Sequence, residues 1–317
     1  MIEFKVETDL KEYDKFINER KGSFIQCSRW PEIKVVWKPY FFCGFRDGER
    51  VLACLVLERS LSLCGRIWYT PDGPVTDYSD GEIITEFTKF IKAELKKHGI
   101  NDCRIYNDGF IVIKAGVGAG AGIGYNCGTG TCCNSIDDNG NMLQVGGFDV
   151  LSGDKGNGHW VATQSFRAVY DEICLGKKET LITKLMAEKA GITDRESLLE
   201  TIAKLESEEA ESYIRMFIGS FFEAANSGDE VALEIIDEMA QRGADFTAAH
   251  IKKMAFAGET VNVVLSGSMH TKAFSQLYVD ALIEKATKEC KRNLKFIKLD
   301  QPPVTGCINW IFQQYRK

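Results

Sequence analysis

The residues with the clearest chemical potential are glycines and threonines near the middle of the chain. Gly128 and Gly130 alternate with Thr129 and Thr131 between two apolar, strand-like runs. Glycine lets backbone N–H groups approach a phosphate closely, and a threonine hydroxyl adds a further donor. The strand–GTGT–strand order predicts a β-hairpin, and the lysine of a Walker P-loop is absent. A tight turn without a ligand is the simpler alternative for this pattern.

A second glycine group includes Gly146, Gly147 and the stretch 153–158, and it leads directly into a predicted helix. The first N–H groups of a helix lack internal partners, so a helix N-terminus after glycines can bind an anion or a hydroxyl group. Asp154 in this stretch could accept hydrogen bonds from a polyol. The alternative is that Asp154 caps the helix that follows.

Asp108 lies upstream, in the segment IYNDGFIVIKAG. We expect a strand on either side of it, which would place its carboxylate at a strand end beside the glycine-rich hairpin. A carboxylate in that position is suited to act as a general base. The alternative is a plain hairpin turn, because Asn-Asp-Gly is a strong turn signal in its own right.

The cysteines show no metal-binding pattern. The chain has 11 of them, and Cys127, Cys132 and Cys133 form the only cluster. No C-x-x-C spacing and no paired histidines accompany this cluster, so we interpret its members as small buried residues around a tight loop and expect no metal held by protein ligands. An odd number spread over a long chain also argues against a disulfide framework.

These candidate residues need a scaffold, and the sequence predicts one in two parts. In residues 1–99 the apolar spacing of 10–17 predicts a helix, and Asp47-Gly48 predicts the turn of a hairpin. A strand at 66–70 runs into a Pro-Asp-Gly-Pro corner, and 81–98 predict an amphipathic helix that Gly99 terminates. The first part is therefore expected to be α+β.

From residue 100 the composition changes. Residues 100–150 are rich in glycine and β-branched residues, which predicts short strands and tight loops. Successive amphipathic helices are expected after Gly158, with a capping box of Thr193 and Glu196 before one of them. Strands at TVNVVLSG and LKFIKLD follow, each with a helix after it. This alternation predicts a layered α/β architecture for residues 100–317.

The bulk properties exclude some classes of function. The formal net charge is -6, and lysine and arginine are scattered, so a nucleic-acid surface with its basic stripe is not expected. No apolar run reaches the length of a membrane span, and the first residues lack the pattern of a secretion signal. We therefore expect a cytoplasmic protein without nucleic-acid or membrane partners.

In their order along the chain, the motifs resemble one known family. N-D-G is followed by G-T-G-T, by G-G-x5-G-D-x-G-x-G-x-W, by a long helical segment, and by VVLSGSMH and PPVTGCINW. This order resembles the BadF/BadG/BcrA/BcrD ATPase family of the actin-like superfamily, and within it the N-acetylglucosamine kinase-like proteins. The resemblance covers residues 100–317. It implies the C-terminal lobe of an actin-like ATPase, with a ribonuclease H-like α/β fold and a helical insert.

The resemblance also implies roles for individual residues. Asp108 matches the catalytic base that takes the proton from the sugar 6-hydroxyl. The cofactors would be ATP and Mg²⁺, and the reaction would be in-line phosphoryl transfer, which relies on positioning and charge stabilisation. The resemblance places nucleotide contacts at Gly128, Thr129, Gly130, Thr131 and Gly267, and sugar contacts at Asn107, Gly146, Gly147 and Asp154.

The chain departs from this family at three points. Members usually carry an acidic residue where Lys155 stands and a Trp or Met where Phe148 stands. The family also needs an N-terminal lobe that opens with D-x-G-G-T, and this motif does not occur in the chain. Residues 1–99 or another chain would have to supply the other wall of the cleft.

Residues 1–99 resemble a different family, the FemA/FemB/FemX peptidoglycan-bridge aminoacyltransferases, which are built from GNAT-like domains. Two motifs, SFIQCSRWPEIK and WYTPDGPVTDY, carry this resemblance. It implies a partial GNAT-like α+β module. The matching residues are Phe24, Gln26, Ser28, Trp30, Tyr69, Pro71, Gly73, Pro74, Asp77 and Tyr78. Asp72 departs from the usual arginine, and the aromatic residues could equally be core.

Three hypotheses follow from the sequence. The first is an ATP-dependent amino-sugar kinase or ATPase that uses Asp108, with activity impaired if the first phosphate lobe is missing. The second is an aminoacyltransferase of peptidoglycan-bridge synthesis, and the third is a non-catalytic fusion remnant. For the first hypothesis the expected partners are a nucleotide and a small sugar, with a homodimer left open.

Overall fold

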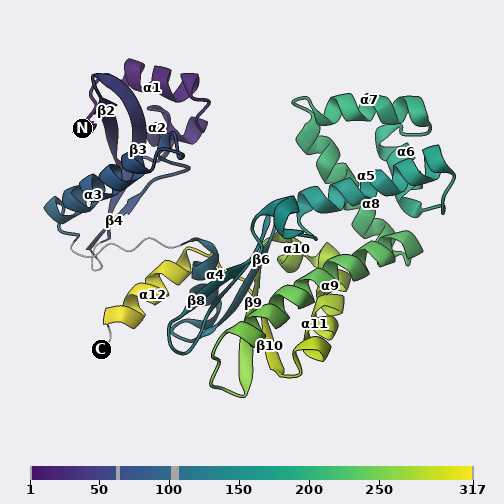
Figure 1. Cartoon of the computed structure of the whole chain (residues 1–317). Coiled ribbons are helices and arrows are strands. Elements are labelled where there is room, and N and C mark those ends of the chain that lie inside the picture. The colour runs from purple at the N-terminus through teal and green to yellow at the C-terminus, as the bar shows by residue number, and fades with distance from the viewer. Residues whose placement is uncertain (1, 62–64, 101–106, 316–317) are drawn as a thin grey trace. The chain divides into compact units, whose positions relative to one another are not determined.

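The chain folds as a mixed α/β protein (Figure 1), seen in a computed structural model that describes residues 2–61, 65–100 and 107–315. It divides into two compact units, residues 1–105 and 106–317. Each unit has its own sheet and its own core clusters. Within the described ranges, no helix has both the length and the apolar character needed to cross a membrane.

The first unit is built on an antiparallel sheet in the order β1-β2-β3-β4, with β5 also paired to β3. Its strands are β1 (Ile2–Val6), β2 (Lys38–Arg46), β3 (Glu49–Leu61), β4 (Gly65–Tyr69) and β5 (Val75–Thr76). The turn between β2 and β3 has positive φ at Asp47 (51°) and Gly48 (85°). Two successive positive φ angles match the twist of a two-residue hairpin, so this predicted turn is confirmed.

Helices cover both faces of this sheet. The side chains of β2 and β3 alternate, as successive residues of a strand must. Phe41 and Leu55 pack with α1 (Leu10–Glu19), whereas Phe42 and Val56 pack with α3 (Gly81–Lys97). Short helical turns, η1 (Phe24–Gln26) and α2 (Trp30–Ile33), complete the described helices of this unit.

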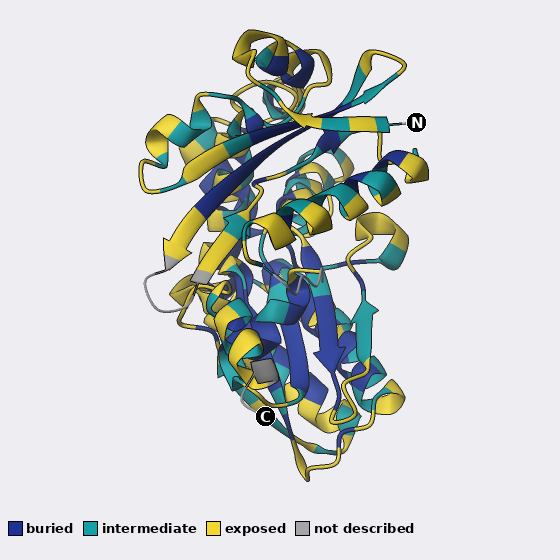
Figure 2. Ribbon diagram, turned by 90° about the vertical axis from the view of Figure 1, so that its left-hand side faces the viewer, coloured by how far each residue is buried: buried dark blue, intermediate teal, exposed yellow. Residues whose placement is uncertain are grey.

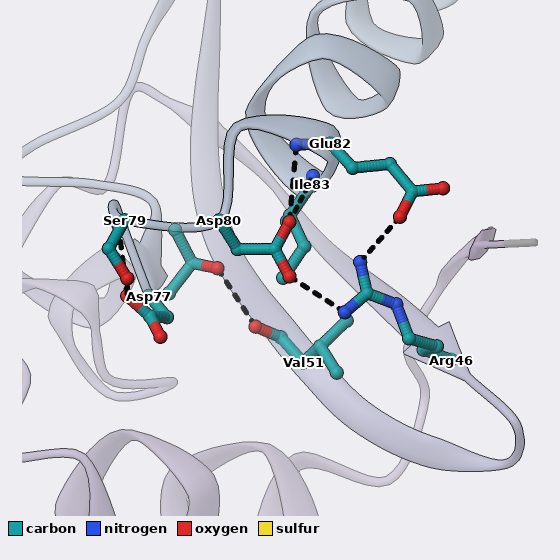
Figure 3. Close-up of polar contacts among 8 residues, drawn as sticks. Arg46, Val51, Asp77, Ser79, Asp80, Glu82 and Ile83 are labelled. Carbon is teal, nitrogen blue, oxygen red and sulfur yellow. Dashed lines mark hydrogen bonds and ion pairs between the residues drawn. The ribbon is translucent and has the colours of Figure 1, made fainter.

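Polar contacts fix both ends of α3. Asp80 accepts hydrogen bonds from the backbone N–H groups of Glu82 and Ile83, and its other oxygen lies 2.7 Å from Nη1 of Arg46 (Figure 3). At the other end, the N–H of Gly99 donates to the carbonyl of Lys96, and the N–H of Ile100 donates to the carbonyl of Leu95. These two hydrogen bonds, with φ of +80° at Gly99, form a Schellman motif, so the predicted helix end is confirmed.

The second unit is built on a five-stranded sheet in the order β10-β9-β6-β7-β8. Its strands are β6 (Gly122–Cys127), β7 (Thr131–Ile136), β8 (Met142–Val145), β9 (Thr260–Ser266) and β10 (Asn293–Lys298). The first three pair antiparallel, while β9 pairs parallel with both β6 and β10. The strands at the centre of this sheet are the buried ones (Figure 2).

Two helical layers enclose this sheet. One face carries α9 (Glu230–Lys253) and α11 (Gln276–Cys290), against which Ile123 and Tyr125 pack. The other face carries α4 (Gly109–Val117), with α12 (Thr305–Tyr315) against it. A Cβ atom at Gly124 would lie 2.8 Å from the Ile113 side chain, so glycine in β6 lets α4 approach closely.

A helical insert separates β8 from β9 in the chain. It consists of α5 (Gly158–Leu175), α6 (Leu181–Ala190), α7 (Arg195–Leu205) and α8 (Ala210–Asn226), and α9 then returns to the sheet. The first four helices stand beyond one end of the sheet (Figure 1). Phe217, Phe221 and Phe222 of α8 are buried, so the apolar face of this helix belongs to the core. The remaining short elements are η2 (Asp149–Ser152), α10 (Ser268–Thr271) and η3 (Ala273–Ser275).

Two local predictions are wrong. Residues 109–117 form α4 rather than a strand, because the apolar run is a helix buried between the sheet and α12 and therefore shows no alternation of polar and apolar faces. The strand expected before Asp108 lies outside the described residues. The capping box of α7 begins one residue later than predicted, with Asp194 and Ser197 as its two members.

Candidate functional site

The predicted GTGT hairpin is confirmed. Tyr125 pairs with Cys133 and Cys127 with Thr131, which leaves residues 128–130 as the connection between β6 and β7. The N–H of Gly128 bonds the carbonyl of Gly130 at 2.9 Å, and the Gly128 carbonyl accepts the first N–H of α5, that of Gly158, at 2.8 Å. The hairpin is therefore joined directly to a helix N-terminus. Space next to the Cα of Gly130 is open.

A cavity of about 260 Å³ lies where this hairpin meets the second glycine group. It combines predicted phosphate contacts with predicted sugar contacts from a different segment of the chain. Its lining residues are Thr129, Gly130, Thr131, Gly147, Asp149, Asp154, Asn157 and His159. Glycine backbone, hydroxyl groups, carboxylates, an amide and an imidazole thus surround one space.

Asp154 organises the loop that forms the second side of the cavity. Its side chain is buried, and Oδ2 accepts hydrogen bonds from the N–H groups of Gly147 (2.9 Å) and Asp149 (3.0 Å). Oδ1 accepts the Ser152 hydroxyl at 2.8 Å. Asp154 does not cap α5, because Asn157 is the N-cap and accepts the Trp160 N–H at 2.9 Å. Its carboxylate therefore holds the loop and keeps only limited capacity for a ligand.

Two side chains from α9 support the same loop from outside. The guanidinium of Arg242 donates from Nε to the Gly153 carbonyl at 2.9 Å and from Nη2 to the Ser152 carbonyl. The ring of Phe246 packs against Gly146, where a Cβ would lie only 3.0 Å from it. Sequence reasoning missed both residues, since nothing in an amphipathic helix indicates which loop its side chains will contact.

Gly267 lies against the hairpin. Its φ is +89°, and a Cβ there would lie 2.2 Å from the Cys127 carbonyl oxygen. A Cβ at Gly128 would in turn be 3.8 Å from the Cα of Gly267. The structure therefore brings together two predicted nucleotide-binding segments that are far apart in sequence, and only glycine fits at position 267.

Asp108 and Asn107 lie at the start of α4. Asn107 Oδ1 accepts the N–H of Gly109 at 2.9 Å and is 3.3 Å from Nδ2 of Asn134 on β7. Asp108 is exposed and makes no side-chain capping bond. Burial, together with the charges of Asp108 and Asp154, raises the pKa of the Cys132 thiol to about 11. Both carboxylates therefore lie within electrostatic range of Cys132, one residue after Thr131, although Asp108 is not among the residues that line the cavity.

Asn157 and His159 are cavity residues that the sequence analysis did not identify. Both belong to the N-terminus of α5, in the stretch already recognised as a helix start after glycines. The Asn-Gly-His-Trp order was a readable N-cap signal for Asn157. Nothing in the sequence indicated that His159 faces the same space.

The two residues that depart from the family pattern, Lys155 and Phe148, lie outside the cavity lining. Lys155 forms an ion pair with Glu238 of α9, so a cation at this position has a partner within the unit. Phe148 is 66 % exposed, and Val150 and Leu151 beside it are also exposed. No group of three or more His, Cys, Asp or Glu side chains that could hold a metal ion occurs in the ranges 2–61, 65–100 and 107–315.

The two motifs of the first unit pack against each other. Gln26 is fully buried, and its Oε1 accepts the N–H of Leu55 in β3 at 2.9 Å. Its Nε2 donates to the carbonyl of Pro71, so one amide joins the first motif to the Pro-Asp-Gly-Pro corner. A Cβ at Gly73 would lie 2.5 Å from this amide. Gln26 therefore joins three segments of the first unit: its own motif, β3 and the Pro-Asp-Gly-Pro corner.

The remaining motif residues of this unit make local contacts. Ser28 donates to Asp14 through its N–H (2.7 Å) and its hydroxyl (2.6 Å). The Tyr78 hydroxyl donates to the Pro74 carbonyl at 2.6 Å, and Asp77 accepts two hydrogen bonds from Ser79. Phe24 is 72 % exposed and packs edge-on to Trp30.

The second unit is an α/β protein in which three features converge. They are the glycine hairpin between β6 and β7, the N-terminus of α5, and Gly267 after β9. A solved structure with this fold is that of a protein from Chromobacterium violaceum assigned as an N-acetylglucosamine kinase. It matches with a TM-score of 0.51 at 13% identity, over 88% of this chain and 95% of that chain. A protein with the same assignment from Porphyromonas gingivalis matches with a TM-score of 0.47 at 13% identity, over 88% and 96% of the two chains.

The chain belongs to the BadF/BadG/BcrA/BcrD ATPase family, whose sequence pattern it matches over residues 79–296. Residues 8–105 match the FemAB family. Both resemblances seen in the sequence are thereby confirmed. A structure of FemX matches with a TM-score of only 0.30 at 14% identity, over 91% of this chain and 70% of that chain. No curated protein sequence matches.

Proposed function

We propose that residues 100–317 bind ATP and transfer its terminal phosphoryl group to a hydroxyl of an amino sugar of the N-acetylglucosamine type. The observation that carries this proposal is the shared cavity, in which the hairpin residues Thr129–Thr131 face the loop residues Gly147 and Asp154. A phosphate site and a sugar site must adjoin in a kinase, because transfer requires the two reacting atoms to be brought within contact distance.

The hairpin side of the cavity suits phosphate oxygens. The N–H groups of Thr129 and Gly130 and that of His159 at the N-terminus of α5 would supply donors, and the Thr129 and Thr131 hydroxyls can add to them. The N–H groups of Gly128, Gly158 and Trp160 are already bonded within the unit. Gly267 lets the loop after β9 lie directly against the hairpin, where the nucleotide would bind. Mg²⁺ would be held chiefly by the phosphates, whose charge it would neutralise.

The loop side suits a polyol. Asp154 keeps one acceptor site, on Oδ1, after its three hydrogen bonds, and Gly147 is exposed beside it, whereas Gly146 is buried. The Asn107 amide nitrogen has no hydrogen bond within the described part of the chain, while its oxygen is already used. A sugar in the cavity would therefore meet the Asp154 carboxylate and Gly147, and Asn107, which does not line the cavity, would add its amide donor only to a sugar that reaches the start of α4.

Asp108 would act as the general base. Its carboxylate would take the proton of the sugar hydroxyl as that oxygen attacks the terminal phosphorus, and the bond to the leaving ADP oxygen would break in line. What supports this role is its position at the start of α4 and its proximity to Cys132, together with a carboxylate that has no ion pair or hydrogen bond among the described residues. Such a base contributes through proton transfer in the transition state.

Domain organisation follows the same proposal. Residues 100–317 would form the C-terminal lobe of an actin-like, ribonuclease H-like fold with its helical insert, and residues 1–99 would form a partial GNAT-like module. Since D-x-G-G-T does not occur in the chain, the first phosphate loop would have to come from another sequence pattern in residues 1–99 or from another chain.

Thermal melting tests the proposal directly. A ligand that binds only the native state raises the melting temperature by mass action. The full chain is melted with ATP–Mg²⁺, with N-acetylglucosamine, and with both. A shift with ATP that grows with the sugar supports a kinase, and a shift with ATP alone supports nucleotide binding without sugar transfer. No shift with either would reject the proposal.

The FemAB match supports one second candidate, an aminoacyltransferase of peptidoglycan-bridge synthesis. It rests on residues 8–105, where Gln26 joins the two family motifs. Transfer of an amino acid from aminoacyl-tRNA to a cell-wall precursor by the full chain would favour it. Absence of both activities and both shifts would leave a non-catalytic fusion.

A further inference from the structure

One buried histidine contacts the two strands that lead into the glycine loops of the second unit. His270 lies in α10 and is fully buried. Its Nδ1 is 3.1 Å from the Tyr125 carbonyl oxygen in β6 and 3.0 Å from the Ser266 carbonyl oxygen in β9. Ser266 directly precedes Gly267, and Tyr125 lies three residues before Gly128. A single imidazole therefore bridges the ends of two adjacent parallel strands.

The contacts fix which nitrogen carries the proton. Both partners of Nδ1 are carbonyl oxygens, which only accept, so Nδ1 must be the N–H donor. The other nitrogen, Nε2, then accepts from the Tyr278 hydroxyl at 3.3 Å. Burial lowers the pKa of His270 to about 4, so the neutral imidazole with this tautomer is the form present near neutral pH.

The ladder that pairs β6 with β9 ends at Asn126 and Ser266, and beyond it the two loops are packed without side chains between them. Gly267 and the Cys127–Gly128 backbone approach so closely that a Cβ would overlap the Cys127 carbonyl. No side chain at 267 or 128 therefore joins the two loops. The His270 imidazole contacts both strands through the carbonyls of Tyr125 and Ser266, and the Tyr278 hydroxyl links it to α11.

We propose that His270 is a positioning residue that holds the GTGT hairpin and the loop at Gly267 in the mutual geometry required for nucleotide binding. It touches neither cavity nor ligand, and it acts through the two carbonyls. The proposal rests on the proposed function for its effect on nucleotide, but its effect on the loops can be measured without any ligand.

The chain offers a matched control in His250 of α9. This side chain is also fully buried, and burial also lowers its pKa to about 4. It makes a similar number of contacts, from Nε2 to the Cys133 carbonyl at 3.1 Å and from Nδ1 to the Ser135 hydroxyl at 2.8 Å. Both partners lie within β7; Cys133 pairs with Tyr125 beside the hairpin, but neither partner belongs to β9 or to the loop at Gly267. Loss of His250 should therefore cost stability without uncoupling the loops.

The experiment compares His270→Leu, His270→Asn and Tyr278→Phe with His250→Leu in the full chain. Hydrogen exchange is followed by mass spectrometry in the peptides spanning 126–131 and 266–271, and the shift of melting temperature with ATP–Mg²⁺ is recorded. We expect His270→Leu to speed exchange in both peptides and to lose most of the ATP-dependent shift. His270→Asn should restore much of both, because its amide nitrogen can replace Nδ1 as donor.

Tyr278→Phe should have a smaller effect in the same direction, and His250→Leu should lower the melting temperature while leaving loop exchange and the ATP-dependent shift intact. The inference is overturned if His270→Leu and His250→Leu behave alike in the two loop peptides, or if His270→Asn restores nothing. If His270→Leu does not fold, hydrogen exchange of His270→Asn and Tyr278→Phe in the same two peptides tests the inference. If the wild-type melting temperature does not shift with ATP–Mg²⁺, the proposed function is rejected. The hydrogen-exchange rates of the two loop peptides still test the positioning role of His270 in that case.

Discussion

At the scale of single residues, Asp154 offers the clearest test of how the cavity is built. Replacement by alanine leaves two backbone N–H groups and the Ser152 hydroxyl without their acceptor. We expect Asp154→Ala to lower the free energy of unfolding by about 2–4 kcal/mol, since buried groups lose their partners. Urea unfolding measures this loss, and any sugar-dependent melting shift should disappear with it.

Asp154→Asn is the control for that change. Its amide oxygen can replace Oδ2 and accept from Gly147 and Asp149, and the Ser152 hydroxyl can turn to accept from the amide nitrogen. The loss should then be only about 1 kcal/mol. An asparagine variant as unstable as the alanine variant would mean that the negative charge, rather than the hydrogen bonds, holds the loop.

Asp108 belongs to the same scale but to the chemistry. Asp108→Asn removes the proposed proton acceptor while keeping size and polarity. Turnover should fall by about 10²–10⁴-fold, and the melting shift with ATP–Mg²⁺ should stay. A coupled assay for ADP measures the rate. Asp280→Asn, on the exposed surface of α11, is the control variant and should keep the wild-type rate. Retention of full turnover by Asp108→Asn would show that another group takes the proton.

At the scale of elements, sequence patterns predicted those features that a local signal controls. The Asp47-Gly48 hairpin and the Gly99 helix end depend on positive φ angles, and the GTGT hairpin depends on a short connection between two strand-like runs. The run at 109–117 was mistaken for a strand, because a helix buried on two sides loses the polar face by which a helix is recognised. Likewise, the contacts of Arg242 and His270 arise from packing between elements, and no spacing along the chain encodes them.

The close approach of β9 and the hairpin can be tested through Gly267. Gly267→Ala introduces a Cβ that would lie 2.2 Å from the Cys127 carbonyl oxygen at a φ of +89°. We expect the second unit to lose roughly 2–4 kcal/mol of unfolding free energy from strain and overlap. Gly258→Ala, in the loop before β9, meets its nearest atom only at 3.5 Å and should be tolerated. Equal melting temperatures for the two variants would contradict the described packing.

At the scale of the whole molecule, the sequence allowed two enzyme families to be recognised but not a complete site of either. The cavity joins segments around residues 130, 147, 154 and 159, so its predicted members could be named from motifs while its shape could not. In the first unit, by contrast, the described motif residues are engaged in holding the chain together, as Gln26 does between Leu55 and Pro71. The cavity is therefore the stronger basis for a function.

Acid should destabilise the second unit through its two buried histidines. Burial lowers the pKa values of His250 and His270 to about 4, whereas a histidine in the unfolded chain titrates near 6.5. Between these values the unfolded state binds more protons than the folded state. Stability is therefore highest above about pH 6.5, falls as the pH drops toward 4, and stops falling from this cause below 4.

The expected loss between pH 7 and 4.5 is about 2–3 kcal/mol for each histidine. Urea unfolding followed by far-ultraviolet circular dichroism measures it, since most described helices belong to the second unit. His250→Leu should be less stable than wild type at pH 7, yet it should lose less on acidification because one titrating group is gone. A pH dependence identical in slope for wild type and this variant would show that His250 is not held neutral in the folded state.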